Sequence, residues 1–182
     1  MSKKLLVLID CQNDFIDGSL ANPEAQKKVA NIVKKVDEFN GDAIIYTLDT
    51  HQEDYLETKE GQLLPVTHCV EGSDGWQINE KIGDAIKRAL DRDITIDVIY
   101  KPTFGSFELP SRVRQLVGEE NFDIDFVGFC TDICVVSNVL ILKAAAYEAA
   151  NITVDSNCCA GVTPEKHEAA LETMRSCQIN VI

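Results

Sequence analysis

The sequence has few basic residues for its length. Seventeen lysines and arginines stand against thirty aspartates and glutamates, which gives a formal net charge of −13 over 182 residues. This charge repels the phosphates of nucleic acids and the headgroups of anionic lipids. We therefore expect neither a nucleic acid nor a membrane surface as a partner.

Long hydrophobic runs are also absent. No apolar segment is long and charge-free enough to span a bilayer. The N-terminal apolar run, residues 4–9, is too short for a secretory signal and is followed directly by Asp10. These absences predict a cytoplasmic protein.

The seven cysteines lack regular spacing. Their number is odd, no Cys-x-x-Cys pair occurs, and no secretory signal accompanies them. This pattern argues against a disulfide framework and gives no indication of a structural zinc knuckle, so we expect reduced thiols.

The sequence does contain a regular alternation of two patterns. Short apolar runs of the buried-strand type lie at residues 4–9, 43–48, 94–100, 124–128, 152–154 and 179–182. Segments with helical spacing of apolar residues lie at 23–36, 76–90, 106–117, 134–150 and 163–176. The alternation predicts one α/β domain over residues 1–182, a six-stranded parallel, doubly wound sheet with helices on both faces.

The helical segment 134–150 is apolar nearly all round. Such a helix is buried on more than one side. We therefore expect it to contribute to a subunit interface, and the protein to be a homo-oligomer.

Residues with useful chemistry follow several of the predicted strands. Asp10, Asp49 with His51, Lys101 and the turn at residues 130–134 each come directly after a different strand. In doubly wound sheets ligands bind outside the carboxyl ends of the strands, near the point where strand order reverses. The sequence therefore predicts a site that these residues share.

Cys134 lies in a position that suits a nucleophile. The strand ends at Gly128, a tight loop follows, and Thr131 or Asp132 can cap a helix with Cys134 in its first turn. Free backbone N–H groups and the helix dipole favour a thiolate there. The alternative is that Cys134 is a small buried hydrophobic residue, as most free cysteines are.

Asp10 and Lys101 can complete a catalytic group with this cysteine. Attack of sulfur on a carbonyl needs a proton carrier, a charge that holds the pair together and N–H donors for the oxyanion. Asp10 can carry the proton, Lys101 can stabilise both anions, and N–H groups of the 130–134 turn can bind the oxyanion. The alternative is an ion pair that merely joins two strand ends.

The long polar loop at residues 52–75 and its flanks contain a possible metal site. Asp49, His51, Glu60 and His68 offer carboxylate and imidazole ligands of the kind that suit Zn²⁺, Mn²⁺ or Fe²⁺. The alternative is a set of solvated loop residues. The third histidine, His167, is interpreted as an ordinary surface residue.

Several segments together resemble the isochorismatase-like cysteine hydrolases, and most closely their nicotinamidase (pyrazinamidase) branch. They are residues 10–15 (Asp-Cys-Gln-Asn-Asp-Phe), 49–51 (Asp-Thr-His), 65–72, 101–106 and 128–135. The similarity runs from near Lys4, through residues 155–161, to the C-terminus.

The resemblance implies a three-layer α/β/α fold and an Asp10, Lys101, Cys134 catalytic triad. It implies a cis peptide bond between Phe129 and Cys130, with the N–H groups of Cys130 and Cys134 forming the oxyanion hole. It also implies a divalent metal ion, zinc above manganese or iron, held by residues that the loop supplies. These implied ligands are Asp49, His51, Glu60 and His68.

Substrate contacts are implied for Phe15, Phe129 and Cys130. Two departures from the branch stand out. The aromatic residue that many nicotinamidases carry shortly before the second metal histidine is replaced by the aliphatic and polar run 63–67. The spacing from Glu60 to His68 is one residue longer than in comparable members.

The resulting hypothesis is a nicotinamidase of NAD salvage, which hydrolyses nicotinamide to nicotinate and ammonia through a cysteine thioester. One alternative is hydrolysis of another small amide or a carbamoyl compound by the same family. An alternative of a different class is a non-catalytic small-molecule binding protein on this fold, with Cys134 inert.

Overall fold

The computed structural model describes residues 2–146 and 148–182, and a six-stranded parallel sheet forms its centre. The strands are β1 (Lys3–Ile9), β2 (Ala43–Asp49), β3 (Thr95–Lys101), β4 (Phe122–Phe129), β5 (Ala150–Ala160) and β6 (Asn180–Val181). They are hydrogen-bonded in the order β3-β2-β1-β4-β5-β6. The predicted six-stranded parallel sheet is confirmed.

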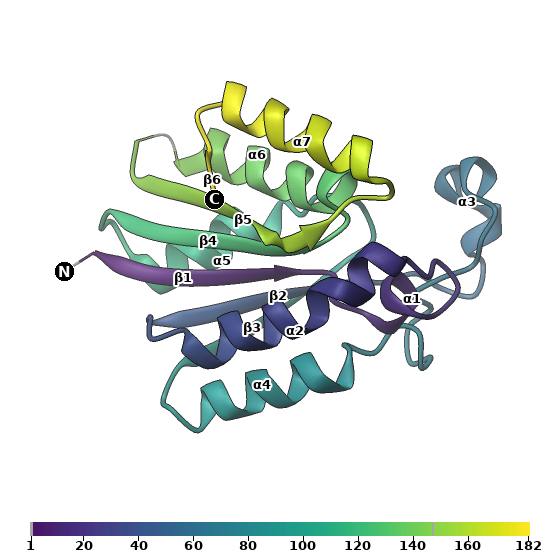
Figure 1. Cartoon of the computed structure of the whole chain (residues 1–182), viewed down its shortest axis with the longest axis horizontal. Coiled ribbons are helices and arrows are strands. Elements are labelled where there is room, and N and C mark those ends of the chain that lie inside the picture. The colour runs from purple at the N-terminus through teal and green to yellow at the C-terminus, as the bar shows by residue number, and fades with distance from the viewer. Residues whose placement is uncertain (1, 147) are drawn as a thin grey trace.

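Helices cover both faces of this sheet (Figure 1). On one face, α2 (Pro23–Glu38) and α4 (Glu80–Leu90) enclose a core with the apolar side chains of β1 and β2. On the other, α5 (Glu108–Val117), α6 (Val136–Ala146) and α7 (Pro164–Ser176) enclose a second core. The chain therefore has the three-layer α/β/α arrangement.

The strand order reverses between β1 and β4, the two central neighbours. The short helices α1 (Asn13–Ile16), η1 (Tyr55–Glu57) and α3 (Lys59–Leu63) belong to the loops that follow β1 and β2. In Figure 1, α1 and α3 lie beyond the arrowhead end of β1. This is the edge where a doubly wound sheet binds its ligands.

The extents of β5 and α4 differ from those predicted. The last central strand, β5, runs to Ala160 rather than ending near residue 154, and its pairing with β4 shifts register between Phe126 and Gly128. The polar stretch at 155–157 hid this extension, because it breaks the apolar pattern. Helix α4 begins at Glu80 rather than Trp76, since the Asn79 side chain accepts a hydrogen bond from the Lys81 N–H and caps it.

Helix α6 ends at Ala146, whereas the apolar pattern predicted a helix to about residue 150, and residue 147 lies outside the described residues. The homo-oligomer expected from this helix remains a prediction that light scattering can test. Within residues 2–146 and 148–182, no helix combines the length and apolar character needed to cross a membrane.

Candidate active site

Asp10, Lys101 and Cys134 meet at the carboxyl edge of the sheet. Lys101 is the last residue of β3, and its Nζ lies 2.6 Å from Asp10 Oδ2 and 3.6 Å from Cys134 Sγ. All three side chains are almost wholly buried, with at most 4% of each residue exposed. The three residues expected to form a catalytic group are thus in contact around one ammonium.

Asp10 is held by the neighbouring strand. It follows β1 with a positive φ of 47°, and its N–H donates to Thr47 Oγ1 over 3.1 Å. The Thr47 hydroxyl donates in turn to Asp10 Oδ1 over 2.5 Å. The carboxylate therefore has one oxygen fixed by Thr47 and the other directed at Lys101.

The three groups shift one another's protonation. Burial raises the pKa of Asp10, and Lys101 opposes that rise. Burial alone would lower the pKa of Lys101, but Asp10 and the other anions nearby outweigh it and hold that pKa above its ordinary value. Lys101 is therefore a permanent cation at neutral pH.

Cys134 lies in a π-helical turn, η2 (Thr131–Val135), that precedes α6. The peptide bond between Phe129 and Cys130 is cis, as the sequence resemblance implied. Burial, followed by the nearby Asp10 carboxylate, raises the pKa of Cys134 well above its ordinary value. Burial and the facing carboxylate therefore oppose the thiolate that the helix position was expected to favour.

A second cluster adjoins this one through Lys101. Its Nζ lies 3.2 Å from Asp49 Oδ1, while Asp49 Oδ2 lies 3.1 Å from His51 Nε2 and 3.5 Å from His68 Nε2. Glu60 Oε1 lies 3.6 Å from His51 Nε2. All four residues expected as metal ligands are therefore gathered at one point.

This donor set fits a divalent metal ion. One oxygen or nitrogen from each of Asp49, His51 and His68 lies within 4.8 Å of the other two, and all three residues are buried. Glu60 Oε1 is buried without a hydrogen-bond partner, as expected of an oxygen that has a cation to bind. Two imidazoles with carboxylates suit zinc, manganese or iron.

Both clusters border a cavity of about 360 Å³. Cys130, Cys134, Asp49, Glu60 and His68 all line it. The remaining wall is mainly apolar and comes from several elements, including Phe15, Leu20, Leu64, Phe104, Ile133 and Val162. The thiol and the metal-type ligands thus face the same small space.

The model of the isochorismatase domain family matches residues 4–182. The chain belongs to the isochorismatase family. No match was found among curated proteins.

Solved structures of isochorismatase-like enzymes resemble the chain over almost its whole length. A nicotinamidase/pyrazinamidase from Bacillus subtilis has 26% sequence identity and a TM-score of 0.83, with 98% of each chain covered. A pyrazinamidase/nicotinamidase from Streptococcus mutans has 26% identity and a TM-score of 0.81, covering 98% of this chain and 99% of its own. The pyrazinamidase of Pyrococcus horikoshii, solved in complex with zinc, has 23% identity and a TM-score of 0.76, with 99% and 98% covered.

One expected substrate contact of the isochorismatase-like site is not where the sequence placed it. The Phe129 side chain is wholly buried in the core against α2 and α4 and does not line the cavity. As the last residue of β4, it points into that core rather than outward. Phe15 and Cys130 do line the cavity, and the Phe15 ring meets the His68 ring edge-on at 5.8 Å.

Several residues support the site although nothing in the sequence indicated a role for them. Gln12 is wholly buried, and its amide binds the Asp49 backbone twice, donating to the carbonyl oxygen and accepting from the N–H, each over 2.8 Å. Asp14 accepts from the Cys69 N–H over 2.7 Å, beside His68. Their shared position in the 10–15 motif is the only clue the sequence offered.

Tyr55 is a further supporting residue. Its ring lies 4.6 Å from that of His51 and 4.9 Å from that of His68, measured between centroids, and only 1% of the residue is exposed. Its hydroxyl donates to the Leu64 carbonyl oxygen over 3.1 Å. Tyr55 therefore packs against both imidazoles from outside the cavity, while Leu64 forms part of the cavity wall.

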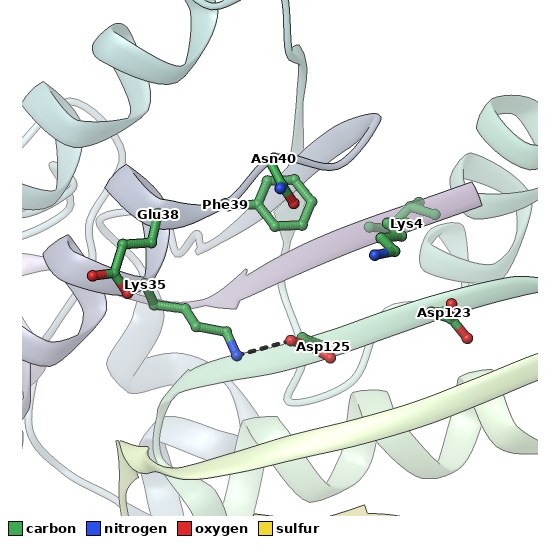
Figure 2. A pocket seen from close by; sticks show the side chains of 8 residues that line it. Lys4, Lys35, Glu38, Phe39, Asn40, Asp123 and Asp125 are labelled. Atoms are coloured by element: carbon green, nitrogen blue, oxygen red, sulfur yellow. Dashed lines mark ion pairs between the residues drawn. The ribbon is translucent and has the colours of Figure 1, made fainter. Parts of the chain in front are cut away.

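A larger hollow of about 450 Å³ lies at the opposite edge of the sheet, between the end of α2 and the starts of β1 and β4 (Figure 2). Lys35 dominates it, with Nζ 2.8 Å from Asp125 and 3.2 Å from Asp155. No thiol or histidine lines this hollow among the described residues. This hollow is therefore a groove with ion pairs, whereas the residues with catalytic and metal-binding potential lie at the carboxyl ends of the strands.

Proposed function

We propose that the protein is a nicotinamidase, which hydrolyses nicotinamide to nicotinate and ammonia. The observation that carries this proposal is the position of Cys134, which contacts Lys101 of the Asp10–Lys101 pair and lines the same cavity as Asp49, His68 and Glu60. A cavity of about 360 Å³ suits a single-ring amide.

The residues divide the chemistry as follows. Asp10 takes the proton of the Cys134 thiol, and the sulfur attacks the carboxamide carbon. The N–H groups of Cys130 and Cys134 stabilise the oxyanion. Asp10 then gives this proton to the amide nitrogen, and ammonia departs. A thioester remains on Cys134.

Water then completes the cycle. Asp10 removes a proton from the water as it attacks the thioester carbonyl, and nicotinate leaves as Cys134 regains its proton. Lys101 remains charged throughout and stabilises the Asp10 carboxylate and the sulfur anion in turn.

Asp49, His51 and His68, with Glu60, would hold the divalent ion, and zinc fits this mixed set of imidazoles and carboxylates. When bound, the ion supplies a Lewis acid that can anchor a ring nitrogen of the substrate. Gln12 and Tyr55 keep the ligands in place through the contacts described above.

The test is ammonia release from nicotinamide by purified protein, before and after removal of metal by a chelator. Activity that is lost on chelation and restored by zinc is expected, as is its loss in Cys134→Ala. No ammonia from nicotinamide with metal present would contradict the substrate, and full activity in Cys134→Ala would contradict the mechanism. Inertness toward every small amide would favour a non-catalytic binding protein.

A second candidate function is hydrolysis of a different small amide or carbamoyl compound. Leu64, 36% exposed, lines the cavity near His68 where an aromatic residue would stack on a pyridine ring. A panel of aromatic and aliphatic amides separates the two. A preference of kcat/KM for an aliphatic amide over nicotinamide would support this second candidate.

A further inference from the structure

His167 is not the ordinary surface residue that the sequence indicated. It lies half-buried in the first turns of α7, and its Nδ1 is 2.8 Å from Thr131 Oγ1. Burial lowers the pKa of His167, so its ring is neutral at pH 7 and keeps one nitrogen as an acceptor. One hydrogen bond therefore joins α7 to the first residue of η2 (Thr131–Val135), which we call the nucleophile turn.

The same segment of chain holds the next residue of the turn. Asp132 Oδ1 accepts from the Val162 N–H over 2.9 Å, just before α7. Gly161 permits this close approach, since a Cβ there would lie 2.8 Å from Asp132 Oδ1 and 2.8 Å from the backbone nitrogen of His167. Residues 161–167 thus bind both side chains that lie directly between Cys130 and Ile133.

The turn that these contacts hold contains Cys134 and follows Cys130, whose N–H groups are the expected oxyanion donors. The Cys130 carbonyl oxygen accepts from the N–H groups of Ile133 and Val135, over 3.1 and 3.0 Å, which closes the turn on itself. Thr131 is wholly buried, and neither it nor His167 lines the cavity. Any influence of His167 on the chemistry must therefore pass through Thr131.

We propose that His167 is a positioning residue, which fixes the nucleophile turn through its hydrogen bond to Thr131. The proposal rests on the proposed cysteine-dependent amide hydrolysis and adds a residue to it. With the bond removed, the turn keeps its tether at Asp132 but loses its fixed orientation, so Cys134 and the N–H donors align poorly with the developing oxyanion. Such a defect lowers kcat and leaves substrate binding nearly unchanged.

The first experiment uses paired variants that remove or retain the bond. His167→Ala and Thr131→Val remove it, whereas His167→Asn and Thr131→Ser retain a polar group at the same place. We expect roughly tenfold lower kcat in the first pair, with KM changed by less than about twofold, and near-wild-type kcat in the second pair. Glu172→Ala, an exposed change on α7, is the control for altering that helix.

The double variant His167→Ala/Thr131→Val measures the coupling. If the two side chains act through one bond, the double variant loses no more kcat than either single variant. Wild-type kcat in His167→Ala, or losses that multiply in the double variant, would overturn the proposal. If His167→Ala does not fold, Thr131→Val with its serine counterpart decides the question alone.

A second measurement does not depend on any substrate. Alkylation of Cys134 by iodoacetamide can be followed by mass spectrometry of the peptide that contains Cys134. Its rate reports how often the turn opens to expose this thiol, since only 4% of the residue is exposed in the structure. We expect Cys134 to react at least about threefold faster in His167→Ala than in wild type, because local opening becomes easier. Unchanged alkylation would refute the positioning role even if nicotinamide proved to be the wrong substrate.

Discussion

At the scale of single residues, the site is a balance of buried charges around one ammonium. Lys101 faces the carboxylates of Asp10 and Asp49 and the sulfur of Cys134, all within 3.6 Å of its Nζ. Lys101 is the ammonium that all three of these groups contact, so the charge on each of them is stabilised by this one lysine. The balance makes the reactivity of Cys134 depend on which neighbour is charged.

Asp10→Asn separates the effect of the carboxylate on the pKa of Cys134 from its proposed role in proton transfer. Because Asp10 raises the pKa of Cys134, its neutralisation should lower that pKa, increase the thiolate fraction at neutral pH and speed alkylation. Hydrolysis should fall roughly 100-fold or more, because the proton carrier is lost. The pH dependence of Cys134 alkylation and the turnover rate are the two measurements.

The opposite change provides the comparison. Lys101→Met removes the charge that opposes the pKa rise, so Cys134 should be alkylated more slowly than in wild type at the same pH. An Asp10→Asn protein whose Cys134 reacts no faster than wild type would show that the carboxylate does not control this thiol.

At the scale of elements, one buried amide in α6 connects the nucleophile turn to the loop that follows β3. Asn138 Nδ2 donates to the carbonyl oxygens of Cys134 and Phe104, over 2.8 and 3.0 Å, and its Oδ1 accepts from the Ser106 N–H over 3.0 Å. The loop after Lys101 and the helix after Cys134 therefore share a single side chain. Elements far apart in the sequence are brought together there.

Asn138→Ala should lower the free energy of unfolding by roughly 3 kcal/mol, because three backbone groups lose a partner and two of these hydrogen bonds are buried. Chemical denaturation monitored by circular dichroism measures this. Ser137→Ala is the adjacent control, since its hydroxyl donates to the Ile133 carbonyl oxygen one turn earlier, and a loss below about 1 kcal/mol is expected. Equal losses in the two variants would contradict the role of Asn138.

At the scale of the whole molecule, the metal-type cluster closes the long loop after β2 onto the sheet. His51 and His68 lie on either side of η1 and α3, and both contact Asp49 at the end of β2. An ion bound there would bind the folded chain and not the unfolded one. It should therefore stabilise the whole fold.

Zinc at about 100 times its dissociation constant should add roughly 2.7 kcal/mol of stability, which corresponds to a rise in Tm of about 5–10 °C for a chain of this size. Differential scanning calorimetry of metal-free protein with and without zinc measures the shift. His51→Ala and His68→Ala should abolish it, and Glu60→Gln should reduce it. His167→Ala is the matched control that should retain it, and an equal shift in all four variants would exclude this site.

Much of this protein follows from the sequence alone. The apolar runs and helical spacings determine six strands and the helices between them, because burial requires those periods. The placement of Asp10, Asp49, Lys101 and Cys134 directly after different strands determines that they share an edge, because parallel strands end together. These local rules need no knowledge of distant contacts.

Tertiary structure decided the rest. It buried Phe129 in the core, extended β5 past its polar stretch and turned His167 inward to Thr131, since each depends on what a distant segment places beside it. It also raised the pKa of Cys134, although the helix position favoured a thiolate. Burial and the position of Asp10 exist only in the folded chain, and they outweigh what the local turn could supply.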